Sequence, residues 1–149
     1  MGGLIYGENG PDGHFGSLTW DKVGGDQTIG FRHLDGGEGT YESGIQMWQQ
    51  PDISVDQMLA QRASVMKIKD EAERKAAYQE LVDNNQLTQR RLFLGKNRSN
   101  ASILEMLDMK GNSRLALMVE ADGTPKLIFL DEEGKIILSI PEEDTGLLE

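Results

Sequence analysis

The two histidines are the side chains with the clearest capacity for chemistry in this sequence, because the chain contains no cysteine. The lack of cysteine excludes disulfide bonds, thiolate catalysis and cysteine-based zinc sites. His14 and His33 lie on either side of a predicted turn at residues 21–26. If Trp20 pairs with Gln27 across that turn, His14 faces His33 with about 5 Å between their Cβ atoms, close enough to share a metal or to titrate as a pair.

This histidine pair is the candidate metal site of the sequence, and it is a weak one. A register shifted by one residue would set His14 opposite Arg32 instead. The first register pairs apolar residues with one another, as does the equivalent pairing of Leu104 with Leu117 further along the chain. Two ligands alone make a poor metal site, so we interpret His14 and His33 as partly exposed strand residues and expect no metal and no cofactor.

A second candidate is the Gly95-Lys96 dipeptide with Ser99 behind it, which looks like the end of a phosphate-binding loop. In such a loop, another glycine stands five residues before the glycine of the Gly-Lys pair, and a Ser or Thr directly follows the lysine. A helix must also begin there, so that its first N–H groups point at the phosphate. Position 90 is arginine, Asn97 follows the lysine, and strand signals come next. We therefore reject nucleotide binding.

Acidic and aromatic residues leave one enzymatic alternative open. The 25 acidic residues allow a carboxylate pair for glycoside hydrolysis, and Trp20, Tyr41 and Trp48 could form a platform on which a sugar stacks. The acidic turns lack the alternation of a calcium loop, and G-x-S-x-G and H-E-x-x-H are absent. No residue is predicted to be catalytic, and a non-enzymatic role is favoured.

Composition narrows the classes of partner. The chain of 149 residues fits one domain, and its net charge is −10, from 15 basic and 25 acidic residues. Binding to nucleic acid depends on basic side chains that neutralise phosphates, so we expect no nucleic-acid partner. Anionic membrane surfaces are disfavoured for the same reason, and we expect no membrane contact by this domain itself.

The C-terminal third reads as an antiparallel meander. Short aliphatic runs alternate with acidic turns that end in glycine at Gly111, Gly123 and Gly134. In such a turn the acidic side chain accepts hydrogen bonds from main-chain N–H groups ahead of it, and the glycine takes the left-handed conformation. Turn chemistry therefore explains Asp108, Asp122 and Asp131 without a metal.

The two ends of the chain carry related sequences. GGLIYGEN at residues 2–9 matches RRLFLGKN at 90–97, and the turns that follow match as well. The predicted fold is mainly β (α+β), with two related antiparallel meander units, 1–50 and 90–141, packed together and a flexible tail at 142–149. Whether the sheet closes into a barrel or forms a sandwich stays open.

A helical hairpin is predicted as an insert at 53–85 between the units. Ser54 and Asp70 are N-cap residues, and Gln57 completes a capping box with Ser54. The helical stripe that we expect to cover one side of the sheet consists of Val55, Met58, Leu59, Ala63 and Met66.

Residues 127–130 and 136–138 are apolar at successive positions, so both faces of their strands need cover. Either the helical hairpin or another subunit must supply it. We name Ile128, Leu130 and Ile137 as candidate interface residues, because an uncovered apolar patch marks an interaction site.

Four stretches, GGLIYG at 2–7, GSLTWD at 16–21, Asp26-Gln27 and KLIFLD at 126–131, resemble a family of uncharacterised bacterial proteins. The resemblance implies repeated β-hairpin units ending in x-D-x-x-G-K behind an N-terminal membrane anchor or signal, so that the natural protein would begin before Met1. It implies an extracytoplasmic or envelope-anchored location and carries no activity.

These observations predict a non-enzymatic, extracytoplasmic β-rich module that binds a protein partner or forms a homo-oligomer. The alternative is a small-molecule or carbohydrate-binding β domain, or a hydrolase with a carboxylate pair. That alternative requires a concave pocket lined by Trp20, Trp48 or the histidines.

Overall fold

The computed structural model describes residues 2–8, 13–37 and 39–141; the predicted tail, 142–149, lies outside the described residues. Within them, the chain forms nine β-strands and two α-helices. The strands are β1 (Gly2–Glu8), β2 (His14–Asp21), β3 (Gln27–Asp35), β4 (Tyr41–Gln49), β5 (Gln89–Lys96), β6 (Ser102–Leu107), β7 (Ser113–Val119), β8 (Pro125–Leu130) and β9 (Ile136–Ile140). The helices α1 (Val55–Met66) and α2 (Glu71–Asp83) lie between β4 and β5 in the chain.

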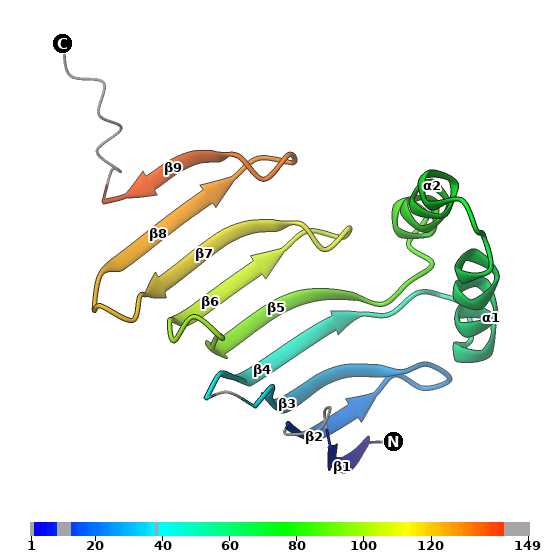
Figure 1. Ribbon diagram of the computed structural model, residues 1–149, viewed down its shortest axis with the longest axis horizontal. Coiled ribbons are helices and arrows are strands. Elements are labelled where there is room, and N and C mark those ends of the chain that lie inside the picture. The colour runs from blue at the N-terminus through cyan, green and yellow to red at the C-terminus, as the bar shows by residue number, and fades with distance from the viewer. Residues whose placement is uncertain (1, 9–12, 38, 142–149) are drawn as a thin grey trace.

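All nine strands form one antiparallel sheet in chain order, from β1 at one edge to β9 at the other (Figure 1). The prediction of a mainly β fold with an antiparallel meander is confirmed. The segments 1–50 and 90–141 are joined edge to edge, because β4 pairs with β5. They therefore share a single layer.

One turn geometry recurs in the C-terminal half. After β6, the N–H of Asp108 donates to the carbonyl oxygen of Asn112, and the N–H of Gly111 donates to the carbonyl oxygen of Asp108. The same two bonds close the turns that begin at Asn97, Glu120 and Asp131. The fourth residue has a positive φ, 83° at Gly111, which glycine adopts without a steric penalty. The predicted meander turns are confirmed.

The register of β2 against β3 differs from the predicted one. We expected Trp20 opposite Gln27, and therefore His14 opposite His33, but Trp20 pairs with Ile29. His33 consequently faces a glycine, and the two histidines are not opposed. This prediction is wrong.

The turn between the two strands explains the error. The N–H of Lys22 donates to the carbonyl oxygen of Asp26, so the loop closes one residue away from the expected pair. A β-bulge after Trp20 then adds a further residue on β3. In the second half of the sheet, Leu104 pairs with Leu117 as predicted.

Both helices begin at the predicted caps. The N–H of Gln57 donates to the Ser54 hydroxyl oxygen at 3.2 Å, and the N–H of Ser54 donates to the Gln57 side chain at 3.0 Å, which completes the capping box. The Asp70 carboxylate accepts a hydrogen bond of 2.9 Å from the N–H of Glu73. Each cap satisfies main-chain donors that have no partner within the helix.

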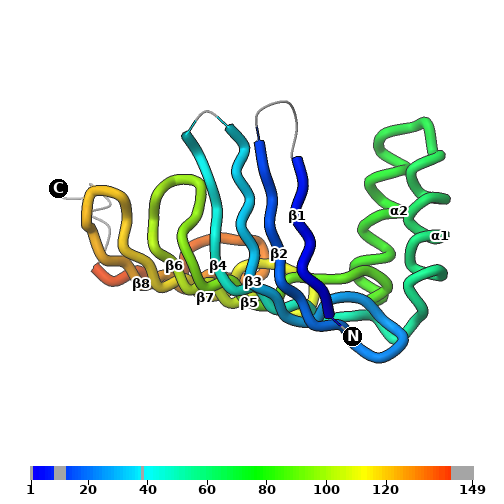
Figure 2. The backbone as a smooth tube through the Cα atoms, turned by 90° about the horizontal axis from the view of Figure 1, so that it is seen from below, coloured from blue at the N-terminus to red at the C-terminus, as the bar shows by residue number. Residues whose placement is uncertain are grey.

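The helical hairpin covers neither face of the sheet, contrary to our expectation. The helices α1 and α2 pack on each other and stand beyond the ends of β4 and β5 (Figures 1 and 2). Met58 is buried in a small cluster with Val82 and Leu87, whereas Leu59 and Met66 of the predicted stripe are 52% and 60% exposed. The hairpin leaves the sheet at the end of β4 and re-enters it at the start of β5, and these two neighbouring strands lie in the middle of the sheet.

In the part of the chain that the structure describes, neither helix combines the length and apolarity that a membrane span requires.

Candidate interaction surface

One row of apolar side chains crosses the whole sheet on one face. Side chains alternate between the two faces of a strand, so strand pairing decides which residues of neighbouring strands lie side by side. Each member of the row is directly opposite the next. The members, from β1 to β9, are Leu4, Leu18, Phe31, Ile45, Leu94, Leu104, Leu117, Leu127 and Ile140.

A second row runs beside the first on the same face, from β2 to β9. Its members are Trp20, Ile29, Met47, Leu92, Met106, Leu115, Phe129 and Leu138. We call the two rows together the apolar face. None of its side chains carries a charge, and many are open to solvent: Phe31 is 51% exposed, Leu117 51% and Trp20 47%.

The opposite face, which we call the inner face, holds smaller, more polar and more deeply buried residues. Its buried members include Thr19, Gln46, Phe93, Ala116 and Ser139. The sheet is bent, and the ends of β1 to β4 far from the hairpin rise to the same side as the two helices (Figure 2). Side chains on the inner side of a bend are crowded by their neighbours, which accounts for this difference in burial.

Paired glycines permit close approach of strands on the inner face. Gly44 lies opposite Gly95 in the β4–β5 pair. A Cβ atom on Gly95 would lie 2.6 Å from the Cα atom of Gly44, and one on Gly44 would lie 2.8 Å from the Phe93 ring. No larger residue fits at either position without displacement of the chain, so the glycines let Phe93 cover the centre of the inner face.

The aromatic platform that the sequence left open as an alternative is not assembled around the two tryptophans. Trp20 is on the apolar face, where its ring meets the edge of Phe31 at 6.3 Å between centroids. Trp48 lies over Gly30 on the inner face, with a ring atom 3.3 Å from where a Cβ atom of that glycine would be. The two indoles therefore lie on opposite sides of the sheet and cannot stack on one ligand.

A polar cluster borders the apolar face. The Lys96 ammonium lies 3.5 Å from the centroid of the Tyr41 ring and donates to the Tyr41 carbonyl oxygen at 3.1 Å. The His33 ring lies 5.5 Å from the same ring. Beside the cluster, a shallow hollow of about 390 Å³ is lined mainly by His33, Leu18, Phe31 and their neighbours. This arrangement places the Lys96 ammonium at the border of the apolar face.

The inner face carries its own ion pair. Arg90 donates to the Glu105 carboxylate at 2.8 Å, and its guanidinium lies 5.4 Å from the Phe93 ring centroid. The side chains of Arg90 and Glu105 are 33% and 19% exposed. Both charges are paired, and the pair shields Phe93 from water.

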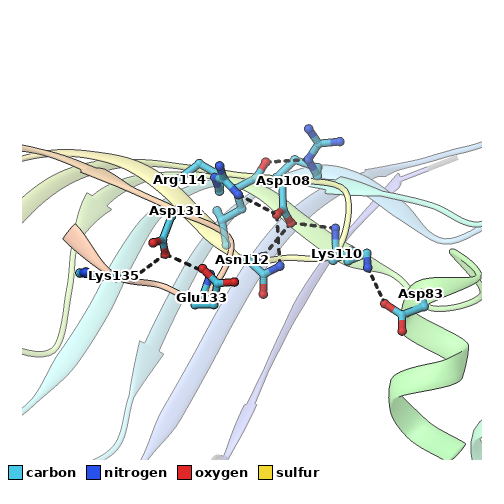
Figure 3. Close-up of polar contacts among 10 residues, drawn as sticks. Asp83, Asp108, Lys110, Asn112, Arg114, Asp131, Glu133 and Lys135 are labelled. Carbon is cyan, nitrogen blue, oxygen red and sulfur yellow. Dashed lines mark hydrogen bonds and ion pairs between the residues drawn. The ribbon is translucent and has the colours of Figure 1, made fainter. Parts of the chain in front are cut away.

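The acidic turns at the hairpin end of the sheet form a hydrogen-bonded edge (Figure 3). The Asp108 carboxylate accepts hydrogen bonds from the N–H groups of Lys110 and Asn112 at 2.9 and 3.0 Å. Asp131 accepts from main-chain N–H groups in the same way in the turn after β8. The predicted turn chemistry is confirmed at both positions.

These contacts affect the ionisation of Asp108. Burial is the largest single influence and favours the neutral form, but hydrogen bonds from Asn112 and Lys110 and the charge of Arg114 together outweigh it. The pKa of Asp108 is consequently lowered from its usual value. Lys110 also joins this edge to the helical hairpin through an ion pair of 2.8 Å with Asp83.

The three predicted interface residues lie in the β8–β9 hairpin but not together. Ile128 is on the inner face, opposite Ala116, and is half-buried, as is Leu130. Ile137 is 64% exposed and follows Ile136 at a β-bulge. Their neighbours in the two rows, Leu127 and Phe129, are half-buried as well, and the more exposed members of the rows include Leu4, Phe31 and Leu117.

The structure gives the two histidines different neighbours. His14 pairs with Glu8 of β1, and His33 lies against Tyr41. Among the described residues there is no group of three or more histidine, aspartate or glutamate side chains that could hold a metal ion.

Comparison of the chain with protein-family models, with curated proteins and with solved structures finds no match.

The apolar face was not among the features predicted from the sequence. Its signal is present, because β2, β3, β4 and β5 each place apolar residues two positions apart, as in Leu92 and Leu94. The rows form only when all eight strand registers are correct at once, and the predicted β2–β3 register was not. Because β8 and β9 are apolar at successive positions, the predicted interface residues all lay in these two strands, at one edge of the sheet.

Proposed function

We propose that this chain is a non-enzymatic interaction module that works by covering its apolar face with protein. The observation that supports the proposal is the pair of uninterrupted apolar rows across the sheet, with Phe31 and Leu117 half-exposed near opposite edges. A sheet normally buries one face against another layer, and here the helices do not supply that layer.

The size of the apolar face argues against a passive surface. Nine strands about 4.8 Å apart span roughly 40 Å, and two rows at about 7 Å per pair of residues span roughly 14 Å. The product, on the order of 500–600 Å², is already at the upper end of the largest apolar patch on a typical monomer, about 300–600 Å². Contact of this apolar area with water, or with a polar surface, is unfavourable. We therefore expect a partner that covers it with an apolar surface.

A second part of the proposal is that the segments 1–50 and 90–141 derive from one repeated β unit. The turns after β2 and β6 both follow a β-bulge and both close with an N–H donated to the carbonyl oxygen four residues on, at Lys22 and at Asp108. Descent of the two halves from one β unit rests on the sequence match of residues 2–9 with 90–97, because turns closed in the same way also begin at Asn97, Glu120 and Asp131. An extracytoplasmic setting rests on the family resemblance given above.

The proposal is tested by whether the apolar face behaves as a binding surface. We would measure solution mass and the fluorescence of an apolar dye, anilinonaphthalene sulfonate, for the wild type, for Phe31→Asp and for Leu117→Asp. The control is Val23→Asp, at a turn residue that is 96% exposed and belongs to neither row.

We expect the wild type to associate or to bind the dye, both face variants to lose that property, and the control to keep it. Circular dichroism confirms that each variant is folded. If the wild type and both folded face variants share the same mass and bind no dye, the apolar face is not an interaction surface and the proposal fails.

A further inference from the structure

We infer that the partner on the apolar face is a second copy of this chain, placed face to face by a twofold axis so that Leu94 lies beside its own copy. The inference rests on the proposed function and names the occupant of the same surface. It accounts for the layer that the fold lacks: a sandwich consists of two sheets about 10 Å apart with apolar inner faces, and this chain supplies one of them.

The area of the apolar face fits a dimer. The two rows cover roughly 500–600 Å², and the side chains flanking them raise the footprint toward the ~800 Å² that each partner buries in a stable complex. A small peptide or a single helix would leave much of the length from β1 to β9 uncovered. A second nine-stranded sheet has the same length, and because the apolar face is the outer side of the bend, the two copies make their closest contact near the middle of the rows.

Charge also favours a second copy. The chain has a net charge of −10, which opposes association in general. Neither row contains a charged residue, so contact between the rows of the two copies buries no charge, and the Lys96 ammonium beside them is held against the Tyr41 ring. The acidic turn residues such as Asp108 and Asp131 lie beyond the strand ends, where water screens them.

Symmetry selects Leu94. In a twofold interface the same patch contributes from both subunits. If the twofold axis lays the first row of one subunit over the first row of the other, the residue at the middle of the row lies beside the same residue of the second copy. The strand β5 is the fifth of nine, so the midpoint is Leu94, which is 47% exposed in the single chain.

The absence of cysteine makes the test simple. We would prepare Leu94→Cys and the control Val23→Cys, add a short bis-maleimide, and determine mass by light scattering in parallel. We expect a wild-type mass of two chains at micromolar concentration and efficient cross-linking of Leu94→Cys but not of Val23→Cys. Leu94→Lys should weaken association by about a hundredfold or more, because it buries unpaired charges.

Each outcome decides the inference. If Leu94→Lys does not fold, Leu117→Lys replaces it at a position nearer the edge of the same row. A monomeric wild type that binds the apolar dye overturns the second copy but leaves the proposed function standing. Higher oligomers that cross-link equally at Val23→Cys also overturn it, because they indicate association through another surface.

Discussion

Truncation to alanine at two consecutive residues of β5 should lower the free energy of unfolding by different amounts, because the two side chains lie on opposite faces of the sheet. Phe93 is 2% exposed on the inner face, and Leu94, the next residue, is 47% exposed on the apolar face. Removal of a buried phenylalanine ring typically costs 3–5 kcal/mol, from lost transfer energy and from the cavity left behind. We expect Phe93→Ala to lower the free energy of unfolding by about 3–4 kcal/mol, since Gly44 beneath the ring has no side chain to fill the space.

Leu94→Ala should cost much less in the single chain. Full burial of a leucine contributes about 1.5–3 kcal/mol, and roughly half of this side chain already contacts water, so we expect a loss of about 1 kcal/mol. At protein concentrations where a second copy covers the face, the loss should grow to about 2 kcal/mol or more. Phe93→Ala should show little change with concentration, because its ring does not face the partner.

The assay is urea unfolding followed by tryptophan fluorescence, at protein concentrations below and above the association midpoint. Trp20 reports from the apolar face and Trp48 from the inner face. Equal losses for the two variants at the lowest concentration would refute the assignment of one face as core and the other as open surface. A concentration-independent cost for Leu94→Ala would contradict cover by a second copy.

Three further changes test the turns and the hairpin. Gly111→Ala should destabilise the protein by about 1 kcal/mol or more in urea unfolding, because φ is 83° there, whereas Gly16→Ala, where an added Cβ atom meets nothing within 4 Å, should cost clearly less. The folded-state pKa of Asp108 lies below its unfolded value, so its stabilisation is complete above pH ~4 and is lost as pH falls through the folded pKa; Asp108→Asn should flatten the acid limb of a stability–pH curve, and an unchanged limb would contradict this. Asp83→Asn removes the ion pair between Asp83 and Lys110, whose two side chains are 45% and 54% exposed. Because solvent screens such pairs, the thermal midpoint should stay unchanged within error. A large fall in the midpoint would show that the pair anchors the hairpin.

Local chemistry made the turns and caps predictable from sequence. An aspartate followed three residues later by glycine requires only main-chain donors within the same turn, and Asp108 with Gly111 forms that turn in the structure. The capping box at Ser54 depends on Gln57 alone, within one helical turn. Such features need no knowledge of distant contacts, which is why they were predicted correctly.

Longer-range features were not accessible in the same way. The position of the helical hairpin depends on the pairing of β4 with β5, which the sequence does not show. The predicted helical stripe that includes Leu59 and Met66 would face a core only if a sheet lay beneath it, and both residues are exposed. The β2–β3 register depended on a β-bulge after Trp20, which inserts a residue without a clear signature. One such residue decides which side chains meet.

The two faces of the sheet differ in a way that links bending to association. Glycines such as Gly44 and Gly95 on the inner face allow close strand approach, and the sheet bends toward the side on which the hairpin stands. The same bend spreads the side chains of the apolar face apart, which exposes Phe31 and Leu94 although neither carries a polar group. Replacement of Gly95 by a larger residue should therefore alter the curvature of the outer surface and weaken association without touching it. A folded Gly95→Ala variant that associates as tightly as the wild type would show that the bend and the interface are independent.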